Sequence, residues 1–404
     1  MEKFSVKRTL LLSLPYAWIS IFNAVLDNGL PVILTASPED GGLALNFTLK
    51  GIVMALDNIL GLFLLPLFGW LSDKSKSRWG KRTPFAIAGG VLAALLWIGT
   101  GLALGLQSKW LFLILLGGSL ASIAFSRPAS LAILPDFTPL EHRRTAQAIT
   151  DIVSILCTVA GIVLISLAAP HGYHTIFYAS AALMLPLIAA FLFTVKERAW
   201  TAQAATTAEQ NTTDSAQTNN RILLLAGVFF FYVAYNGLVS SLSNYAVDIL
   251  RLNKQQFVLP QGLTLLAAVL FSIPSAKLAK RFARKRLLLL GIAIMAAAFA
   301  LASLQKGLGL AMFACFFFTG AGFAAALTNL YPFLLELSDG KKIGGATAAF
   351  NMVMTLAMVI TPIASGFLSD HTRWGLKILF PYCIASLGLS FLSVLFIKER
   401  KKTA

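Results

Sequence analysis

The sequence predicts an all-α membrane protein whose twelve transmembrane helices form two six-helix bundles. Hydrophobic residues make up 57% of the 404-residue chain, and charged residues make up only 12%. Ordinary soluble domains carry about twice that charged share. A soluble protein this apolar would be unable to cover its own surface with polar groups, so lipid must solvate most of the chain. The apolar residues also fall in runs long enough to cross the ~30 Å hydrocarbon core of a bilayer.

Twelve such runs mark the expected spans. They cover residues 9–35, 47–72, 84–106, 110–134, 147–169, 175–195, 222–250, 256–279, 287–305, 308–335, 345–369 and 375–397. The segment between the sixth and seventh runs is polar and rich in Thr, Ala, Gln and Asn, which is typical of a flexible linker. We therefore expect an N-terminal bundle (1–195), a cytoplasmic linker (196–221) and a C-terminal bundle (222–404).

The distribution of basic residues predicts the orientation in the membrane. A net charge of +16 is compatible with nucleic-acid binding, but the basic residues form short bursts between apolar runs, as membrane anchors do. With the N-terminus and every second loop assigned to the cytoplasm, these segments hold 25 Lys and Arg, and the opposite side holds seven, including Lys50. Because positive charge marks cytoplasmic loops, we expect both termini in the cytoplasm, a bacterial inner-membrane location, lipid contact and no nucleic-acid partner.

Reactive and metal-binding patterns are missing from the sequence. Cys157, Cys315 and Cys383 lie inside apolar runs, and neither a Cys-x-x-Cys pair nor a Cys/His metal spacing occurs. The sequence therefore predicts no disulfide, no metal site and no resident cofactor. Because no nucleophile–base pair stands out either, we expect a monomeric transporter of a small molecule and not an enzyme.

Charged residues inside the expected spans are the candidates for function. Four acids lie there, Asp27, Asp57, Asp151 and Asp248, and Arg127 is the basic residue deepest in a span. A charge near the bilayer centre costs roughly 2.5–3.5 kcal/mol, so each one needs a partner or a function.

Asp57 is the strongest candidate for proton coupling. It lies near the middle of the run 47–72 and is followed by Asn58, a candidate for substrate binding. Burial favours the neutral acid, so this carboxyl group can serve as the carrier of a coupling proton. The alternative is a structural carboxylate bonded to a neighbouring helix or to Arg127.

Asp27 is the second candidate for proton coupling. The residues that follow it, Asn-Gly-Leu-Pro, tend to break helices. Either the helix ends there and Asp27 is an ordinary acid at the end of a span, or the helix is broken around a site. Asp151 lies in the first turn of its span, where the helix dipole favours an acid, and Asp248 lies near the end of its span in contact with solvent.

Arg127 is the main candidate for substrate binding. It lies too deep in its span to reach the interface easily, so we expect it to face a polar cavity. Its fixed fork of donors suits sugar hydroxyl groups or a carboxylate. The alternative is a permanent ion pair with Asp57, Asp27 or Asp151, and both hold if the pair breaks when substrate or a proton arrives.

Two matching polar stripes extend the candidate site. At helical spacing, the first span carries Tyr16, Ser20, Asn23 and Asp27, and the seventh carries Tyr232, Asn236, Ser240 and Ser243. Paired stripes of amides and aromatic rings suit a hydroxylated solute, although for any single residue a hydrogen bond between helices is the more common explanation. We take Tyr16, Asn23, Tyr232 and Asn236 as candidate substrate-binding residues, with Asn329 and Asn351 as weaker ones.

Three segments resemble a known family. They are GWLSDKSKSRWGKRTPF at 69–85, SRPASLAILPDFTPLEHRRTAQAI at 126–149 and MALDNILGLFLLPLFG at 54–69. They resemble the major facilitator superfamily, in the branch of the glycoside–pentoside–hexuronide:cation symporters and the sucrose:proton symporters. The resemblance covers the first half well and the second half only by general pattern. It implies the major facilitator fold, a central cavity and alternating access.

The resemblance also assigns roles to individual residues. Arg127 matches the arginine that these symporters use to bind sugar. The matches to the gating loop and its neighbour across the bundle are Gly69, Asp73, Arg78, Gly80, Lys81, Arg82, Asp136, Arg143 and Arg144. The corresponding loop of the second half, AKLAKRFARKR, has no Asp, so we expect a weaker or differently built gate there.

We therefore expect a secondary transporter that takes up a sugar or glycoside. The expected coupling ion is H⁺, with Na⁺ as the alternative. An amphipathic or lipid-like solute, or drug efflux, is the rival within transport. A nutrient sensor without transport activity is the rival from another class.

Overall fold

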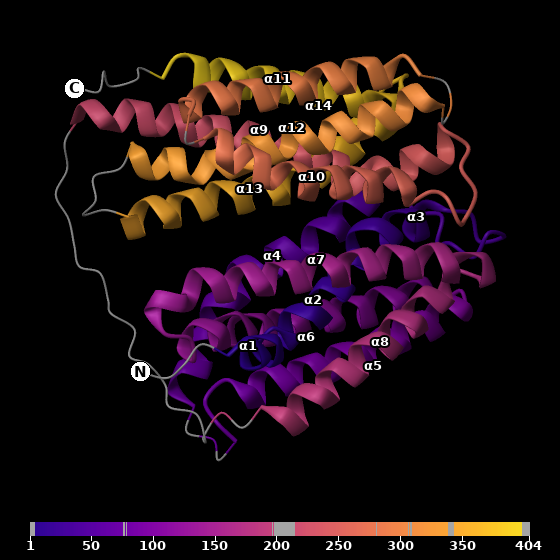
Figure 1. Cartoon of the computed structure of the whole chain (residues 1–404). Helices are drawn as coiled ribbons and strands as arrows, with labels where there is room; N and C mark the ends of the chain where they lie inside the picture. Colours follow the sequence, from indigo (N-terminus) through magenta and orange to yellow (C-terminus); the bar gives the residue numbers. More distant parts are fainter. Residues whose placement is uncertain are drawn as a thin grey trace. The chain divides into compact units, whose positions relative to one another are not determined.

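The computed structural model describes residues 5–75, 77, 79–195, 197, 215–279, 281–305, 307, 309–337 and 343–397, and these residues form helices and no strands (Figure 1). The first half contains α1 (Val6–Leu12), α2 (Leu14–Ala24), a π-helical turn (Val25–Gly29), α3 (Leu30–Thr35), α4 (Phe47–Lys74), α5 (Thr83–Gly105), α6 (Lys109–Asp136), α7 (Arg143–Ala168) and α8 (His174–Thr194). The second half contains α9 (Ser215–Asp248), α10 (Leu259–Leu278), α11 (Arg284–Ser303), α12 (Leu310–Glu336), α13 (Ile343–His371) and α14 (Leu379–Leu395).

Twelve helical stretches within the described residues are long and apolar enough to cross a membrane. The first runs from Leu14 to Thr35 and joins α2, the π turn and α3, and the last runs from Gly375 to Leu395. The prediction of an all-α protein with twelve spans is therefore confirmed. One boundary differs, because α9 begins at Ser215, inside the segment that the sequence predicts as a linker.

The contacts group the chain into two compact units. Unit 1 comprises Met1–Leu45, Leu56–Thr206 and Lys254–Val258, and unit 2 comprises Asn46–Ala55, Thr207–Asn253 and Leu259–Ala404. Each unit contains one of the two sets of expected spans, apart from the two short exchanged segments. One of these segments divides α4 between the units. The first turns of α4 belong to unit 2, and the rest of the helix belongs to unit 1.

Close helix contacts and aromatic rings hold unit 1 together. A Cβ atom placed on Gly89 of α5 would lie 2.7 Å from the Cβ of Ser126 and 2.8 Å from the carbonyl oxygen of Ser122, so α5 and α6 approach closely there. Trp97 of α5 packs its ring against Phe177 of α8 at a centroid distance of 4.9 Å. Small residues at helix contacts are typical of membrane proteins, where dispersion contacts replace the hydrophobic effect.

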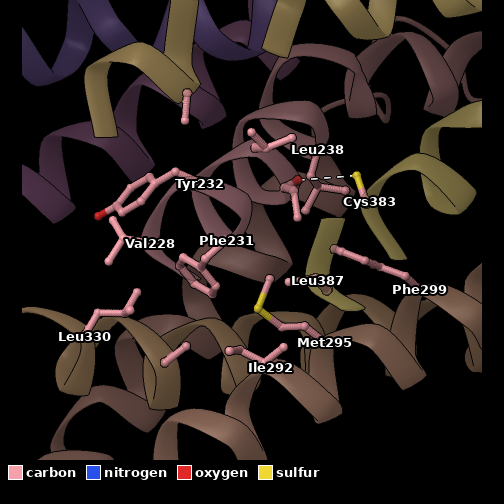
Figure 2. Packing of buried hydrophobic residues seen from close by; sticks show 14 of the residues in the cluster. Val228, Phe231, Tyr232, Leu238, Ile292, Met295, Phe299, Leu330, Cys383 and Leu387 are labelled. Atoms are coloured by element: carbon pink, nitrogen blue, oxygen red, sulfur yellow. Dashed lines mark hydrogen bonds between the residues drawn. The ribbon is translucent and has the colours of Figure 1, made fainter. Parts of the chain in front are cut away.

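Unit 2 has a continuous apolar core (Figure 2). Phe231 of α9, Met295 and Phe299 of α11, and Leu387 of α14 are all fully buried in it. The Cys383 thiol donates to the Ala234 carbonyl oxygen over 3.3 Å, which satisfies one of the few polar groups in this region. The core holds α9, the helix that carries the predicted polar stripe, in place within unit 2.

The contact between α11 and α12 gives a test of this packing. A Cβ atom on Gly291 would lie 2.7 Å from both the Ala326 nitrogen and the Gly322 carbonyl oxygen. We expect Gly291→Ala to destabilise the protein by about 1–3 kcal/mol, the usual cost of overpacking, and to lower the thermal unfolding midpoint in detergent. The matched control is Gly388→Ala in α14, where a Cβ meets nothing within 4 Å. Equal midpoints for the two variants would contradict the packing described.

Candidate functional site

Arg127 lies at the centre of the candidate site in unit 1. From α6, its Nη2 donates to Oδ1 of Asn23 on α2 over 3.1 Å. Its Nη1 lies 3.7 Å from Oδ2 of Asp57 on α4, and the side chains of Arg127 and Asp57 are 20% and 15% exposed. Because both groups are mostly shielded from water, their attraction is stronger than that of a surface pair. Of the three acids considered as partners for Arg127, the structure selects Asp57.

Asp27 lies in a widened turn of the first span. Residues Val25–Gly29 form a π turn in which the Leu30 N–H bonds to the Val25 carbonyl oxygen. Pro31 has no N–H to donate to the Asp27 carbonyl oxygen, which accounts for the local loss of α-helical bonding. The helix therefore does not end at Asp27, as one sequence alternative supposed. It continues through a π turn, a feature frequent at functional sites.

The site contains two carboxylates and one guanidinium group. Asp27 is one helical turn from Asn23, and it interacts electrostatically with both Asp57 and Arg127. No hydrogen bond or ion pair joins the Asp27 side chain to another described residue. Since Arg127 can neutralise one charge and makes its ion pair with Asp57, Asp27 has no cation of its own.

The other polar residues predicted in the first half lie around this cluster. The Tyr16 hydroxyl donates to the Leu131 carbonyl oxygen over 2.9 Å, one turn beyond Arg127 on α6. Asn58 follows Asp57 on α4 and is partly buried. Unit 1 therefore brings Tyr16 and Asn23, together with the charged residues, onto three spans that meet.

In unit 2, the predicted substrate-binding residues do not gather at one place. Tyr232 is nearly buried and packs edge-on against the rings of Tyr235 and Phe350. The Asn236 amide points to the Met358 carbonyl oxygen of α13, 3.4 Å away. These contacts place two residues of the α9 stripe beside α13.

The two weaker candidates of unit 2 lie apart from this stripe. Asn329 is fully buried, and its Nδ2 donates to the Ala325 carbonyl oxygen of its own helix (2.8 Å) and reaches Ser275 of α10 (3.5 Å). Asn351 is exposed on α13. The contacts of Asn329 are those of an interhelical polar residue, the alternative that the sequence left open.

The predicted gating residues of unit 1 form an ion-pair cluster around Arg82. Its Nη2 lies 2.7 Å from Oδ1 of Asp73, and its Nε lies 3.0 Å from Oδ2 of Asp136. Its Nη1 donates to Ser72 Oγ over 2.7 Å, and Lys81 adds a second ion pair to Asp73 at 3.2 Å. The Arg82 side chain is only 9% exposed. One buried guanidinium group therefore joins the ends of α4 and α6.

Glu197 completes this cluster, and the sequence gives little sign of it. Its carboxylate accepts the backbone N–H groups of Lys81 (2.8 Å), Arg82 (2.9 Å) and Thr83 (2.8 Å) at the beginning of α5. Negative charge at a helix N-terminus is stabilising. Gly80 has φ +115, and a Cβ there would overlap the Glu197 carboxylate, so only glycine fits. The one signal in the sequence is an acid directly after a span, in a segment expected to be a flexible linker.

The remaining predicted gating residues have smaller roles in the structure. The Arg143 guanidinium group donates to the carbonyl oxygens of Pro135 (3.0 Å) and Thr138 (3.3 Å), and so closes the end of α6. A Cβ on Gly69 would lie 3.7 Å from Pro128, an ordinary contact. Arg144 is exposed, and Arg78 lies outside the described residues.

Unit 2 repeats the central ion pair of the cluster. Nε of Arg284, at the beginning of α11, lies 2.5 Å from Oε1 of Glu336, at the end of α12. This pair corresponds to Arg82 and Asp136 at the same ends of α5 and α6. The second loop contains no acid, as the sequence shows, but α12 supplies one. The duplication of the two halves is therefore clearer in the structure than in the sequence.

Twelve candidate spans within the described residues indicate a membrane protein of the kind that the sequence motifs suggest. Residues 19–368 match the family model described as MFS/sugar transport protein. Because the match covers most of the chain, the protein belongs to the MFS/sugar transport protein family and is not an enzyme. The resemblance found in the sequence motifs is thereby confirmed at the level of the superfamily. No curated protein matches the sequence at a significant level.

Solved transporter structures share the fold. A bacterial homologue of the human lysosomal transporter Spinster is 14% identical, with 98% of this chain and 97% of the other covered and a TM-score of 0.74. A peptide transporter POT in complex with sulfate is 15% identical (97% and 93% covered, TM-score 0.75). The nucleoside transporter NupG is 13% identical (96% and 98% covered, TM-score 0.73). At these identities the likeness establishes the fold and leaves the substrate open.

Glu197 provides a test of the cluster at the beginning of α5. Replacing Glu197 with Ala leaves three backbone N–H groups without their acceptor, and loss of a helix cap costs about 0.5–2 kcal/mol. We expect a lower thermal unfolding midpoint in detergent for Glu197→Ala. The matched control is Glu141→Ala, because Glu141 is exposed in the same unit. A midpoint unchanged in both variants would show that the carboxylate does not stabilise the helix.

Proposed function

We propose that this protein is a proton-coupled symporter that takes up a sugar or glycoside by alternating access. The observation that carries this proposal is one partly buried guanidinium group, Arg127, that makes an ion pair with Asp57 and interacts electrostatically with Asp27 within the spans. One of the two carboxylates can bind and release a proton while the guanidinium group stays charged, so the net charge of the site changes by one. The family description as a sugar transport protein supports the substrate class.

Arg127 and Asn23 are the proposed contacts to substrate in unit 1. The guanidinium group donates to Oδ1 of Asn23, so the N–H donors of Arg127 lie beside the amide oxygen of Asn23. A sugar hydroxyl group can replace either partner in this bond and thereby uses the planar donor fork of arginine. Tyr16 and Asn58 are proposed to complete the site in unit 1, and Tyr232 and Asn236 are proposed as substrate-binding residues of unit 2.

Asp27 and Asp57 are proposed to have different roles in proton coupling. Asp57 has Arg127 as its counterion. The Asp27 side chain makes no ion pair with a described residue, and an unpaired carboxylate in a span is costly. We therefore propose that Asp27 carries the coupling proton and that Asp57 sets the position of Arg127. Protonation drives transport only if it changes the relative stability of the two access states.

The charge cluster around Arg82 is proposed to act as the cytoplasmic gate. This assignment follows the orientation that the basic loops favour, with both termini in the cytoplasm of a bacterium and the chain in the inner membrane. Ion pairs that form in one access state and break in the other are a common switching device. We expect the protein to work as a monomer, with a small solute and the lipid bilayer as its partners.

Uptake measurements test the coupling proposal. Labelled mono- and disaccharides are offered to proteoliposomes with an imposed pH gradient, and at least one is expected to accumulate. Asp27→Asn should abolish accumulation but leave exchange of substrate across the membrane. The matched control is Asp151→Asn, since Asp151 is exposed on α7 and bonded only to Gln147. If no sugar accumulates in the unaltered protein, the symport proposal is wrong. If accumulation survives Asp27→Asn, another group carries the proton.

Substitution of Arg127 tests the assignment of the substrate site. Arg127→Lys keeps the charge and removes the planar fork, so we expect the affinity for sugar to fall on the order of tenfold to a hundredfold, the loss expected for charged hydrogen bonds. Direct binding measurements with labelled sugar check this. Asp57→Asn should weaken binding as well, because Arg127 then loses its counterion and its fixed position. Unchanged affinity in Arg127→Lys would exclude a direct role in recognition.

A further inference from the structure

Lys50 is fully buried although it lies in the first turns of α4. Its relative exposure is 1%, which places it among the largest fully buried side chains. The Lys50 ammonium group forms no ion pair with a carboxylate of the described residues. Burying a charged lysine is costly unless its donors are satisfied. This lysine takes no part in the cluster around Arg127 or in the proposed gate.

Three neutral oxygens of α9 hold the Lys50 ammonium group. Nζ donates to the Ser240 carbonyl oxygen (3.1 Å), Ser241 Oγ (3.1 Å) and Asn244 Oδ1 (3.3 Å). An ammonium group has three donors, and here each of them has one acceptor. The acceptors come from a single turn of one helix, so α9 alone brings them together. Carbonyl, hydroxyl and amide oxygens are also groups that can coordinate a small cation.

Further contacts hold the same turns of α4 within unit 2. The Asp370 carboxylate, at the end of α13, accepts the N–H groups of Phe47 (3.0 Å) and Thr48 (2.7 Å). A Cβ on Gly51 would overlap the Pro362 carbonyl oxygen, so the backbones of α4 and α13 touch there. The segment 46–55 is therefore docked on α9 and α13 by backbone contact, a helix cap and the lysine.

This docking has a consequence for transport. Residues 46–55 are part of unit 2, and the same helix continues in unit 1 from Leu56 onwards. Any movement of one unit relative to the other must pull the segment 46–55 away from α9 and α13, or bend α4 near residue 55. Removal of Lys50 from its three acceptors would leave the oxygens of α9 without a cation.

We propose that Ser240, Ser241 and Asn244 form a monovalent-cation site, that the Lys50 ammonium group is its built-in occupant, and that this occupancy holds the first turns of α4 against α9 and α13. The lysine takes the place that a free ion would occupy, so the site needs no ion from solution while α4 is docked. When Lys50 is shortened, the same oxygens are available to a small cation such as ammonium.

The test measures docking directly and needs neither sugar nor a proton gradient. Spin labels are attached at Leu49→Cys on α4 and Leu310→Cys on α12, two exposed positions of unit 2, in a chain with Cys157→Ser. Pulsed electron resonance then gives the distance distribution between the labels in the purified protein. The distance between the labels does not depend on transport. A negative result for the docking proposal therefore leaves the symport proposal untouched, and failure of the symport proposal leaves the docking proposal untouched.

Lys50→Ala is expected to shift the distribution away from the docked distance. Ammonium or methylammonium chloride should restore the docked distance, whereas choline chloride at equal concentration should not, since choline is too large for the site. Lys50→Met, which keeps the stem volume and lacks the charge, should undock without rescue. Lys109→Ala, at an exposed lysine, is the matched control and should keep the original distribution.

Two results would overturn the proposal. One is an unchanged distance distribution in folded Lys50→Ala. The other is a shifted distribution that neither ammonium nor methylammonium restores. If Lys50→Ala fails to fold, the double variant Ser241→Ala/Asn244→Ala takes its place. Loss of two hydrogen bonds to a charged group should then lower the ratio of docked to undocked molecules about a hundredfold, and retention of the original distribution would refute the site.

Discussion

The contact between Arg127 and Asp57 is the interaction on which the proposed mechanism depends. A charge within a span costs roughly 2.5–3.5 kcal/mol, and the one guanidinium group makes an ion pair with only one of the two nearby acids among the described residues. Arg127 makes its ion pair with Asp57 and a hydrogen bond with Asn23. Asp27, in the π turn, makes no ion pair with a described residue. The proposed coupling uses this difference between the two acids.

The charged residues at the helix ends follow a different rule from those inside the spans. At the beginning of α5, Arg82 bridges Asp73 and Asp136 while Glu197 caps the helix. At the beginning of α11, the pair of Arg284 with Glu336 repeats the central bridge. Among the described residues of unit 1, Ser72, Lys81 and Glu197 extend the network around this bridge. The groups that hold the helix ends together are proposed to separate when the gate opens, whereas the site around Arg127 is proposed to exchange a single proton.

The sequence predicted the spans and the charged residues inside them, because each of these features is local. It did not predict the partner of Arg127, since Asp57, Asp27 and Asp151 lie on different spans and only the fold decides which one is close. Glu197 was hidden in a segment expected to be a linker. The sequence alone groups Lys50 with the loop lysines that set orientation, because only the tertiary structure shows that α9 buries it. Whether the bound solute is a sugar also depends on features that no local pattern contains.

Infrared difference spectroscopy on the purified protein tests the central claim most directly. Titration across the pH range should show the carbonyl band of a protonated carboxylic acid that is absent from Asp27→Asn and retained in Asp57→Asn. This result would assign the proton to Asp27 and the ion pair to Asp57, as the contacts of Arg127 suggest. A band that disappears in Asp57→Asn and remains in Asp27→Asn would contradict the account.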